Sequence, residues 1–79
     1  MSAALVETLV KLTVQEPDVV EVNEIQDRGV TVFNVTVAPN DVGRVIGKEG
    51  RVISCIRQIV SAVASKDRKR TVVKIATQD

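Results

Sequence analysis

Residues 45–53 read VIGKEGRVI, and this stretch decides how the rest of the chain is interpreted. Its two glycines, Gly47 and Gly50, stand three positions apart between aliphatic runs. Glycine tolerates the positive φ that a tight reversal between helices requires, and its lack of a Cβ leaves room for a ligand close to the backbone. The stretch therefore predicts a short, open loop between two helices.

The residues around this loop favour an anionic ligand. A helix that begins after Gly50 directs its unpaired N–H groups and the positive end of its dipole toward the loop. Arg44, Lys48 and Arg51 add three positive charges, and Glu49 alone opposes them within residues 44–51. A sugar-phosphate chain resting there would meet both features, so we expect a site for a polyanion.

Two other glycine-containing loops do not fit the spacing. A P-loop has four residues between its glycines, then a lysine and a hydroxyl residue, whereas Gly43 and Gly47 enclose three and Glu49 stands at the hydroxyl position. A dinucleotide fingerprint requires G-x-G-x-x-G directly after a strand, which this segment does not have. A purely structural helix turn stays open as an alternative, because glycine commonly ends helices.

Periodicity around the loop predicts six elements in the order helix, strand, strand, helix, helix, strand. They are expected over residues 2–15, 19–26, 30–38, 41–46, 51–65 and 71–77. The first helix has Leu5, Leu9 and Leu12 on one stripe, which Val6 and Val10 widen and which we expect to be its buried side.

The second long helix has two clear sides. Polar residues recur at spacings of three and four, at Arg51, Ser54, Gln58, Ser61 and Ser65. The apolar side is expected to lie in the core and consists of Val52, Ile53, Ile56, Ile59, Val60 and Val63.

The strand over residues 30–38 alternates clearly, with Phe33, Val35 and Val37 on its core face. A turn at 27–29 joins it to the preceding strand, in which the alternation fails at residues 24–25 and suggests a bulge. These two strands must pair antiparallel. The last strand follows two helices and must run parallel to the second by a right-handed crossover. Together with the helices, the strands predict a single α+β domain over residues 1–79, a three-stranded mixed sheet covered on one face by three helices.

The composition excludes most catalytic chemistry. The chain has no His and one Cys, so zinc sites and Ser/His/Asp or Cys/His arrangements lack essential parts. We expect no catalytic residue, no metal and no cofactor. A lone cysteine favours the cytoplasm, and Glu7 and Lys11 interrupt the apolar N-terminal run, so we expect neither a signal peptide nor a membrane segment. Phe33 is the only aromatic residue, so nucleic acid cannot be held by a platform of stacked rings.

The near-neutral net charge conceals two unlike halves. Residues 1–39 contain two Lys/Arg and six Asp/Glu, a balance of −4, and residues 40–79 contain nine and four, a balance of +5, which sum to the +1 of the chain. The basic half contains the glycine loop. Such an asymmetry would orient a polyanion toward that loop.

Residues 38–53, which read APNDVGRVIGKEGRVI, followed by Ile56 and Arg57, resemble the small single-KH RNA-binding proteins of bacteria. KH domains hold about four nucleotides over a G-x-x-G loop. The resemblance covers nearly the whole chain, and the helix and strand that precede the core unit are similar to the type II arrangement. It implies a type II KH-like domain that binds short single-stranded RNA without catalysis, in post-transcriptional regulation or as an RNA chaperone.

The resemblance also assigns residues. It implies that Gly47, Lys48, Glu49 and Gly50 form the backbone clamp, with Ile46 and Ile53 near the apolar floor of a groove. From their charge, we expect Arg44 and Arg51 to bind RNA as well. Glu49 departs from the more basic or neutral loops of the family, which implies weaker attraction for phosphate. The basic run at residues 66–70 is either a solvated connector or an auxiliary RNA contact.

A second hypothesis makes the chain chiefly an assembly module. A chain of this length buries a small core, so association would stabilise it, and Val30 and Val32 give the outer face of the predicted sheet an apolar part. The resemblance implies a homodimer, or a heterodimer with a larger Jag-like KH protein.

Overall fold

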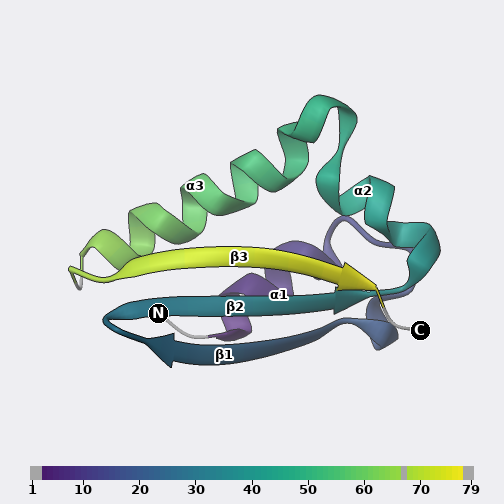
Figure 1. The fold of residues 1–79 in the computed structure, drawn as a ribbon. Coiled ribbons are helices and arrows are strands. Elements are labelled where there is room, and N and C mark those ends of the chain that lie inside the picture. Colours follow the sequence, from purple (N-terminus) through teal and green to yellow (C-terminus); the bar gives the residue numbers. More distant parts are fainter. Residues whose placement is uncertain (1–2, 67, 78–79) are drawn as a thin grey trace.

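The computed structural model describes residues 3–66 and 68–77 (Figure 1). Within them, the helices and strands occur in the predicted order: α1 (Ala3–Lys11), β1 (Glu21–Asp27), β2 (Val30–Val37), α2 (Val42–Ile46), α3 (Arg51–Ser65) and β3 (Arg70–Thr77). Short 3-10 turns occupy Pro17–Val19, Pro39–Asp41 and Lys48–Gly50. None of the helices in these two ranges is long and apolar enough to cross a bilayer.

The three strands form one mixed sheet in the order β1-β2-β3, as predicted. β1 and β2 pair antiparallel through a two-residue turn, in which Arg28 and Gly29 have φ values of 52° and 82°. Such left-handed turns match the twist of paired strands. β3 pairs parallel to β2 and leaves its other edge facing α3, where Figure 1 shows the strand and helix running side by side.

The predicted bulge at residues 24–25 is wrong. The register between β1 and β2 is continuous, from Glu21 opposite Thr36 to Asp27 opposite Val30. β1 is an edge strand exposed along nearly its whole length, so its residues need not alternate between core and solvent. The broken alternation therefore reflects exposure on both faces.

The core lies between one face of the sheet and the helices. Phe33, Val35 and Val37 are fully buried, as the alternation predicted. They pack with buried residues of α1 and α3, namely Val6, Val10, Ile53, Ile56 and Val60. α1 and α3 also contact each other, which places both on the same face and confirms the two-layer α+β arrangement.

The first helix is shorter than predicted and buries only part of the predicted stripe. Residue 2 of the predicted range lies outside the described residues, and the helix ends at Lys11 instead of residue 15. Val6 and Val10 are the buried residues of α1, whereas Leu12 is 78% exposed. The core side of α1 is therefore the valine part of the predicted stripe, with Leu9 partly buried against the core, and only the placement of Leu12 in this side is wrong. Helix termination places Leu12 beyond the last turn, where it no longer follows the helical periodicity.

Candidate functional site

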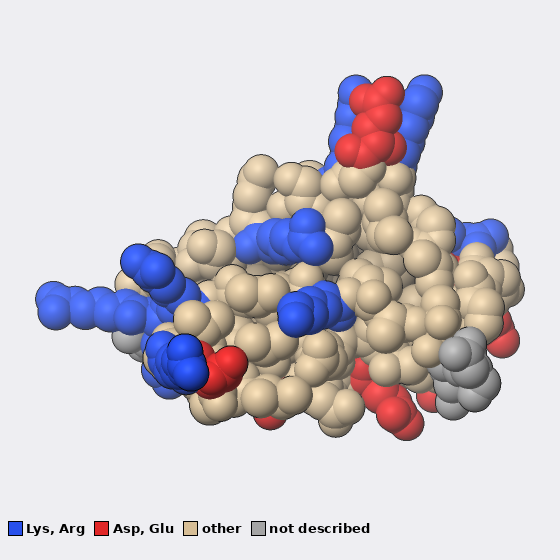
Figure 2. All heavy atoms as spheres, in the orientation of Figure 1, with Lys and Arg blue, Asp and Glu red and all other residues tan. Residues whose placement is uncertain are grey.

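Residues 47–50 reverse the chain between α2 and α3. Three of these four residues have positive φ: Gly47 (77°), Glu49 (57°) and Gly50 (74°). The Gly47 amide donates to the Gly43 carbonyl at 2.8 Å and closes α2, and the Gly50 amide donates to the Gly47 carbonyl at 3.1 Å. The segment is therefore a single tight turn, which projects from the body of the domain in Figures 1 and 2.

The two glycines have different roles in this turn. A Cβ on Gly47 would lie 2.4 Å from Cγ2 and 2.8 Å from the backbone nitrogen of Val52, so the missing side chain makes room for Val52. A Cβ on Gly50 would meet nothing within 4 Å. Open space for a close-fitting ligand therefore lies at Gly50, and Gly47 is required by packing.

The turn also has backbone donors without a partner. The amides of Gly50 and Arg51 bond to the carbonyls of Gly47 and Lys48, but within the described part of the chain no acceptor is bonded to the amides of Lys48 and Glu49. Unpaired amides at the start of a helix, together with its dipole, favour an anion. The 15 residues of α3 follow directly.

The side chains of the turn combine both signs of charge. Arg51 Nη2 lies 3.5 Å from Glu49 Oε2, and both side chains are exposed. An exposed ion pair contributes little free energy, so it can open for another anion at low cost. Lys48 is exposed, and no carboxylate of the described residues pairs with it. Figure 2 shows these basic and acidic side chains standing together above the molecule.

Arg44 lies on α2 beside the carboxylate of Asp41, a contact that was not predicted from the sequence. Its Nη1 donates to the Asn40 carbonyl at 3.0 Å and lies 3.4 Å from Asp41 Oδ1. Asp41 is fully buried. The backbone amides of Gln15 and Glu16 donate to its two carboxylate oxygens, each at 3.0 Å.

These bonds keep Asp41 ionised. The hydrogen bond from the Gln15 amide is the largest influence and lowers the pKa of Asp41 below its ordinary value of 3.8, against the opposing effect of burial. The Glu16 amide and the charge of Arg44 lower it further. The guanidinium of Arg44 thus has a permanent partner beside it, and the positive charge that faces outward comes mainly from Lys48 and Arg51.

The two isoleucines assigned to the groove floor lie in different surroundings. Ile46, at the end of α2, is 38% exposed beside the turn. Ile53 is 6% exposed and belongs to the hydrophobic core. Ile46 is therefore accessible to a ligand at the surface, whereas Ile53 packs the first turn of α3 against the hydrophobic core.

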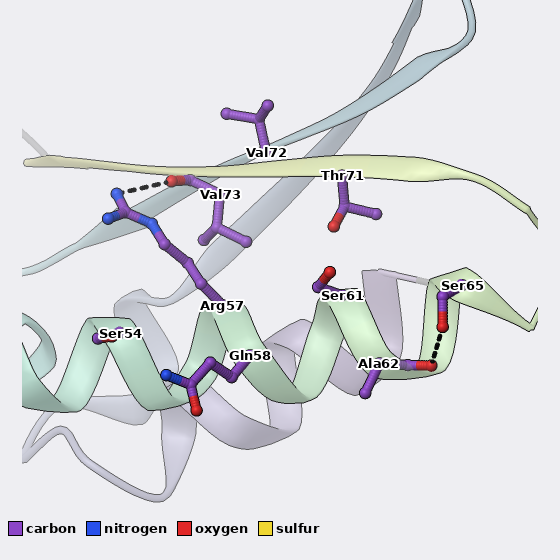
Figure 3. Close-up of a pocket in the computed structure, with 9 residues that line it drawn as sticks. All are labelled: Ser54, Arg57, Gln58, Ser61, Ala62, Ser65, Thr71, Val72 and Val73. Carbon is purple, nitrogen blue, oxygen red and sulfur yellow. Dashed lines mark hydrogen bonds between the residues drawn. The ribbon is translucent and has the colours of Figure 1, made fainter.

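The groove beside this turn runs between α3 and the free edge of β3, and neither Ile46 nor Ile53 is among its lining residues (Figure 3). Its volume is about 690 Å³, within the range of ligand sites. The lining residues are Ser54, Arg57, Gln58, Ser61, Ala62, Ser65, Thr71, Val72 and Val73. The polar side of α3 could have indicated this groove from the sequence. Short hydroxyl side chains along one helix face leave a hollow that long charged side chains would fill.

One side chain crosses this groove. Arg57 Nη2 on α3 donates to the Val73 carbonyl on β3 at 3.2 Å, as drawn in Figure 3. Val73 turns its side chain into the core, so only its backbone meets Arg57.

Comparison with known proteins gives one consistent result. The family model described as "KhpA/KhpB, KH domain" matches residues 3–75. The protein named "RNA-binding protein KhpA" of Caldanaerobacter subterraneus subsp. tengcongensis is 48% identical over 71 residues, which cover 90% of this chain and 95% of the relative. Its namesake in Clostridium acetobutylicum is 44% identical with the same coverage. That of Chlamydia trachomatis is 39% identical over 67 residues, or 85% of this chain and 86% of the relative.

Proposed function

The chain belongs to the KhpA/KhpB KH-domain family, and from this membership we propose that it is an RNA-binding protein that holds a short single strand over residues 47–50. The observation that carries the proposal is the open backbone at Gly50 beside the unpartnered amides of Lys48 and Glu49. KH domains as a class hold about four nucleotides at such a loop.

In this proposal the phosphates meet backbone amides and two cations. The amides of Lys48 and Glu49 donate to phosphate oxygens, and the dipole of α3 adds to the attraction. The Lys48 ammonium and the Arg51 guanidinium strengthen these bonds, because charge-assisted hydrogen bonds are stronger than neutral ones. The Arg51 guanidinium leaves its ion pair with Glu49 and pairs with a phosphate instead. Arg44 contributes through its charge, since Asp41 and Asn40 already hold its guanidinium.

The bases then lie in the groove between α3 and β3. No aromatic side chain lines it, so the bases would pack on aliphatic groups and bond to hydroxyls and to the strand edge. α3 spans about 22 Å at 1.5 Å per residue. It connects the glycine turn to the basic residues Lys66, Arg68, Lys69 and Arg70, with Asp67 outside the described residues. Figure 2 shows basic side chains at both ends of this face, so we include residues 66–70 as an auxiliary contact.

Such a site holds and releases a strand without breaking bonds. We therefore assign no catalytic step, metal or cofactor to it. A small domain of this kind suits post-transcriptional regulation or RNA chaperoning in the cytoplasm.

The test is the double substitution Lys48→Asp with Glu49→Asp. It places two carboxylates beside the proposed phosphates, and we expect a loss of affinity of at least about tenfold for a fluorescent single-stranded oligonucleotide, measured by anisotropy. The melting temperature should stay nearly unchanged, because both side chains are exposed. Aspartate also tolerates the left-handed φ of position 49.

Arg28→Asp is a matched control, because it makes the same total change in charge at the turn between β1 and β2. Asp-Gly is a favoured sequence in such turns, so this variant should fold. We expect it to retain most of the affinity. A folded double variant at positions 48 and 49 with wild-type affinity would reject the clamp.

A second candidate function, assembly, is favoured by a separate observation. An apolar groove of about 340 Å³ lies between α1 and α3 and is lined mainly by Leu9, Leu12, Val52, Cys55, Ile56 and Ile59. Ile59 and Val63 are 45% and 36% exposed, so the prediction that they lie in the core is wrong. The buried side of α3 is a narrower stripe, formed by Ile53, Ile56, Val60 and Ala64. Val32, on the outer sheet face, stands between Ile25 and Val72 in a row across the strands.

A second copy of the chain, or a larger Jag-like KH protein in its place, would cover the groove between α1 and α3. Light scattering across concentration tests the homodimer. We expect a dimer that Leu12→Glu converts to a monomer, since Leu12 is exposed and its loss leaves the core intact. Thr8→Glu, on the exposed surface of α1, is the matched control. A wild-type chain that stays monomeric at all concentrations would reject self-association.

A further inference from the structure

Arg57 lies across the groove between α3 and β3. Its side chain spans from the helix to the edge strand and ends on the Val73 carbonyl (Figure 3). Arg57 is exposed, and no carboxylate among residues 3–66 and 68–77 lies in ion-pair distance of it. Its charge is therefore available to a bound molecule.

The contact with Val73 determines which hydrogen-bonding groups remain open. The N–H and C=O of one residue in a strand point to the same edge, and successive residues alternate between edges. Val73 thus faces the groove with both groups, and Arg57 occupies its carbonyl. A guanidinium has five N–H donors and no acceptor, so several donors stay free around this point. A bound base therefore meets the N–H donors of Arg57 at this point. A strand edge without Arg57 would also present the Val73 carbonyl as a free acceptor.

This pattern discriminates between bases. Guanine presents two neighbouring acceptors, O6 and N7, which match the fork of a guanidinium. Adenine has an amino group in place of O6, and this donor would face the N–H donors of the Arg57 guanidinium. We propose that Arg57 selects guanine at the position of the bound strand that lies beside Val73, a role that rests on the proposed RNA-binding function.

The neighbouring hydroxyls suit the same base. Ser61 and Thr71 face each other across the groove next to Arg57 in Figure 3. A hydroxyl can accept as well as donate. It can therefore receive the N–H groups of guanine that the guanidinium cannot.

The experiment compares uridine-rich octamers that differ at one central base, guanine, adenine or cytosine, in competition anisotropy with the full chain. Cytosine is included because its Watson–Crick edge also has two acceptors. We expect guanine to compete better than adenine and cytosine by roughly fivefold to a hundredfold, the usual value of a bidentate contact. Replacement of guanine by 7-deazaguanine, which lacks the N7 acceptor, should remove most of that advantage.

Arg57→Lys keeps the charge and removes the fork, so the preference for guanine should fall toward unity while some affinity remains. Arg28→Lys is the matched control, with the same chemical change at the exposed turn between β1 and β2, and should keep the preference. Melting curves establish whether each variant is folded. If Arg57→Lys does not fold, the 7-deazaguanine comparison on the wild-type chain decides.

The outcomes separate the two proposals. A wild-type chain that prefers adenine or cytosine, or that binds all three octamers equally, overturns the role of Arg57 while RNA binding stands. A preference for guanine that survives Arg57→Lys, or that is unaffected by 7-deazaguanine, overturns it as well. A chain that binds none of the octamers overturns the proposed function itself.

Discussion

The buried carboxylate of Asp41 accepts a hydrogen bond from the backbone amide of Gln15, 26 residues earlier in the chain. The same carboxylate binds the Glu16 amide and lies beside Arg44 of α2. The Asp41 side chain therefore connects the segment after α1 to the start of α2, the helix that leads into the turn at residues 47–50. Without Asp41, the two amides would lose their partner at a partly buried position.

Asp41→Asn should lower the melting temperature by at least about 5 °C. The carboxylate accepts one backbone amide on each oxygen, whereas asparagine has a single acceptor oxygen. Its NH₂ group would face the second backbone N–H, and two donors cannot bond to each other. Thermal unfolding followed by circular dichroism measures the change. The same substitution at the exposed Asp18 should have little effect, and an unchanged melting temperature in Asp41→Asn would show that the two amides do not need the carboxylate.

The contribution of Asp41 should also depend on pH. Because the Gln15 hydrogen bond lowers the pKa of Asp41 below 3.8, the unfolded state binds the proton more readily than the folded state. The stabilisation is therefore fully present above pH 3.8 and is lost as the pH falls through the lower, folded-state pKa. The difference in melting temperature between wild type and Asp41→Asn should be constant from about pH 7 to pH 5 and narrow below 3.8. A difference that widens in acid would contradict this sign.

The two glycines of the turn should respond differently to alanine. Gly47 has φ 77° and ψ 173°, a region that essentially only glycine occupies, and a Cβ there would collide with Val52. Gly47→Ala should therefore destabilise the fold by about 1–3 kcal/mol or more. Gly50→Ala meets open space and a milder left-handed strain of about 1–2 kcal/mol, but it should weaken RNA binding more than it weakens folding.

Gly43 provides the control for that pair. It lies in α2 with no atom near its missing Cβ, so Gly43→Ala should be neutral or stabilising. Melting curves and anisotropy titrations on the three variants separate the effects. If Gly50→Ala bound RNA as wild type does, the open space at that position would have no role in binding.

Arg44→Gln should reduce RNA affinity less than Lys48→Gln, although both remove one positive charge. The Arg44 guanidinium is held by Asp41 and Asn40, whereas Lys48 is exposed on the turn. Arg44→Gln should instead lower the melting temperature, because it removes a partner of a buried carboxylate. Anisotropy and thermal melts on both variants check the crossed pattern. Equal losses of affinity would place Arg44 in direct contact with the strand.

Affinity should fall with salt in proportion to the phosphates bound. If two or three phosphates are neutralised, the single-strand slope predicts roughly a tenfold loss between 50 and 200 mM salt. Titrations at several salt concentrations give the slope. Lys48→Gln should reduce it by about 0.7, and a slope near zero would exclude a phosphate clamp.

The order of the elements could be predicted because each has a strong local signal. Phe33, Val35 and Val37 alternate with polar residues in β2, and Gly47 and Gly50 punctuate the two helices. These signals depend on residues close together in the chain. The reversal between α2 and α3 is one of them, so the position of the turn was predicted correctly.

Contacts between distant segments could not be predicted in the same way. Asp41 looks like an ordinary acidic residue at a helix start, and its burial depends on the approach of Gln15 from another element. The groove and the bond from Arg57 to Val73 arise only when α3 packs beside the free edge of β3. The distinct roles of Gly47 and Gly50 likewise depend on where Val52 lies.

The seating of Val52 in the hollow of Gly47 also bears on the kinetics of recognition. A turn fixed by its own packing loses little conformational entropy when a strand arrives, since that freedom was already lost when the domain folded. Preorganisation of this kind allows encounter without a slow rearrangement, so association should approach the rates of rigid docking surfaces. Residence time, set by the few contacts along the strand, then becomes the quantity that distinguishes one transcript from another.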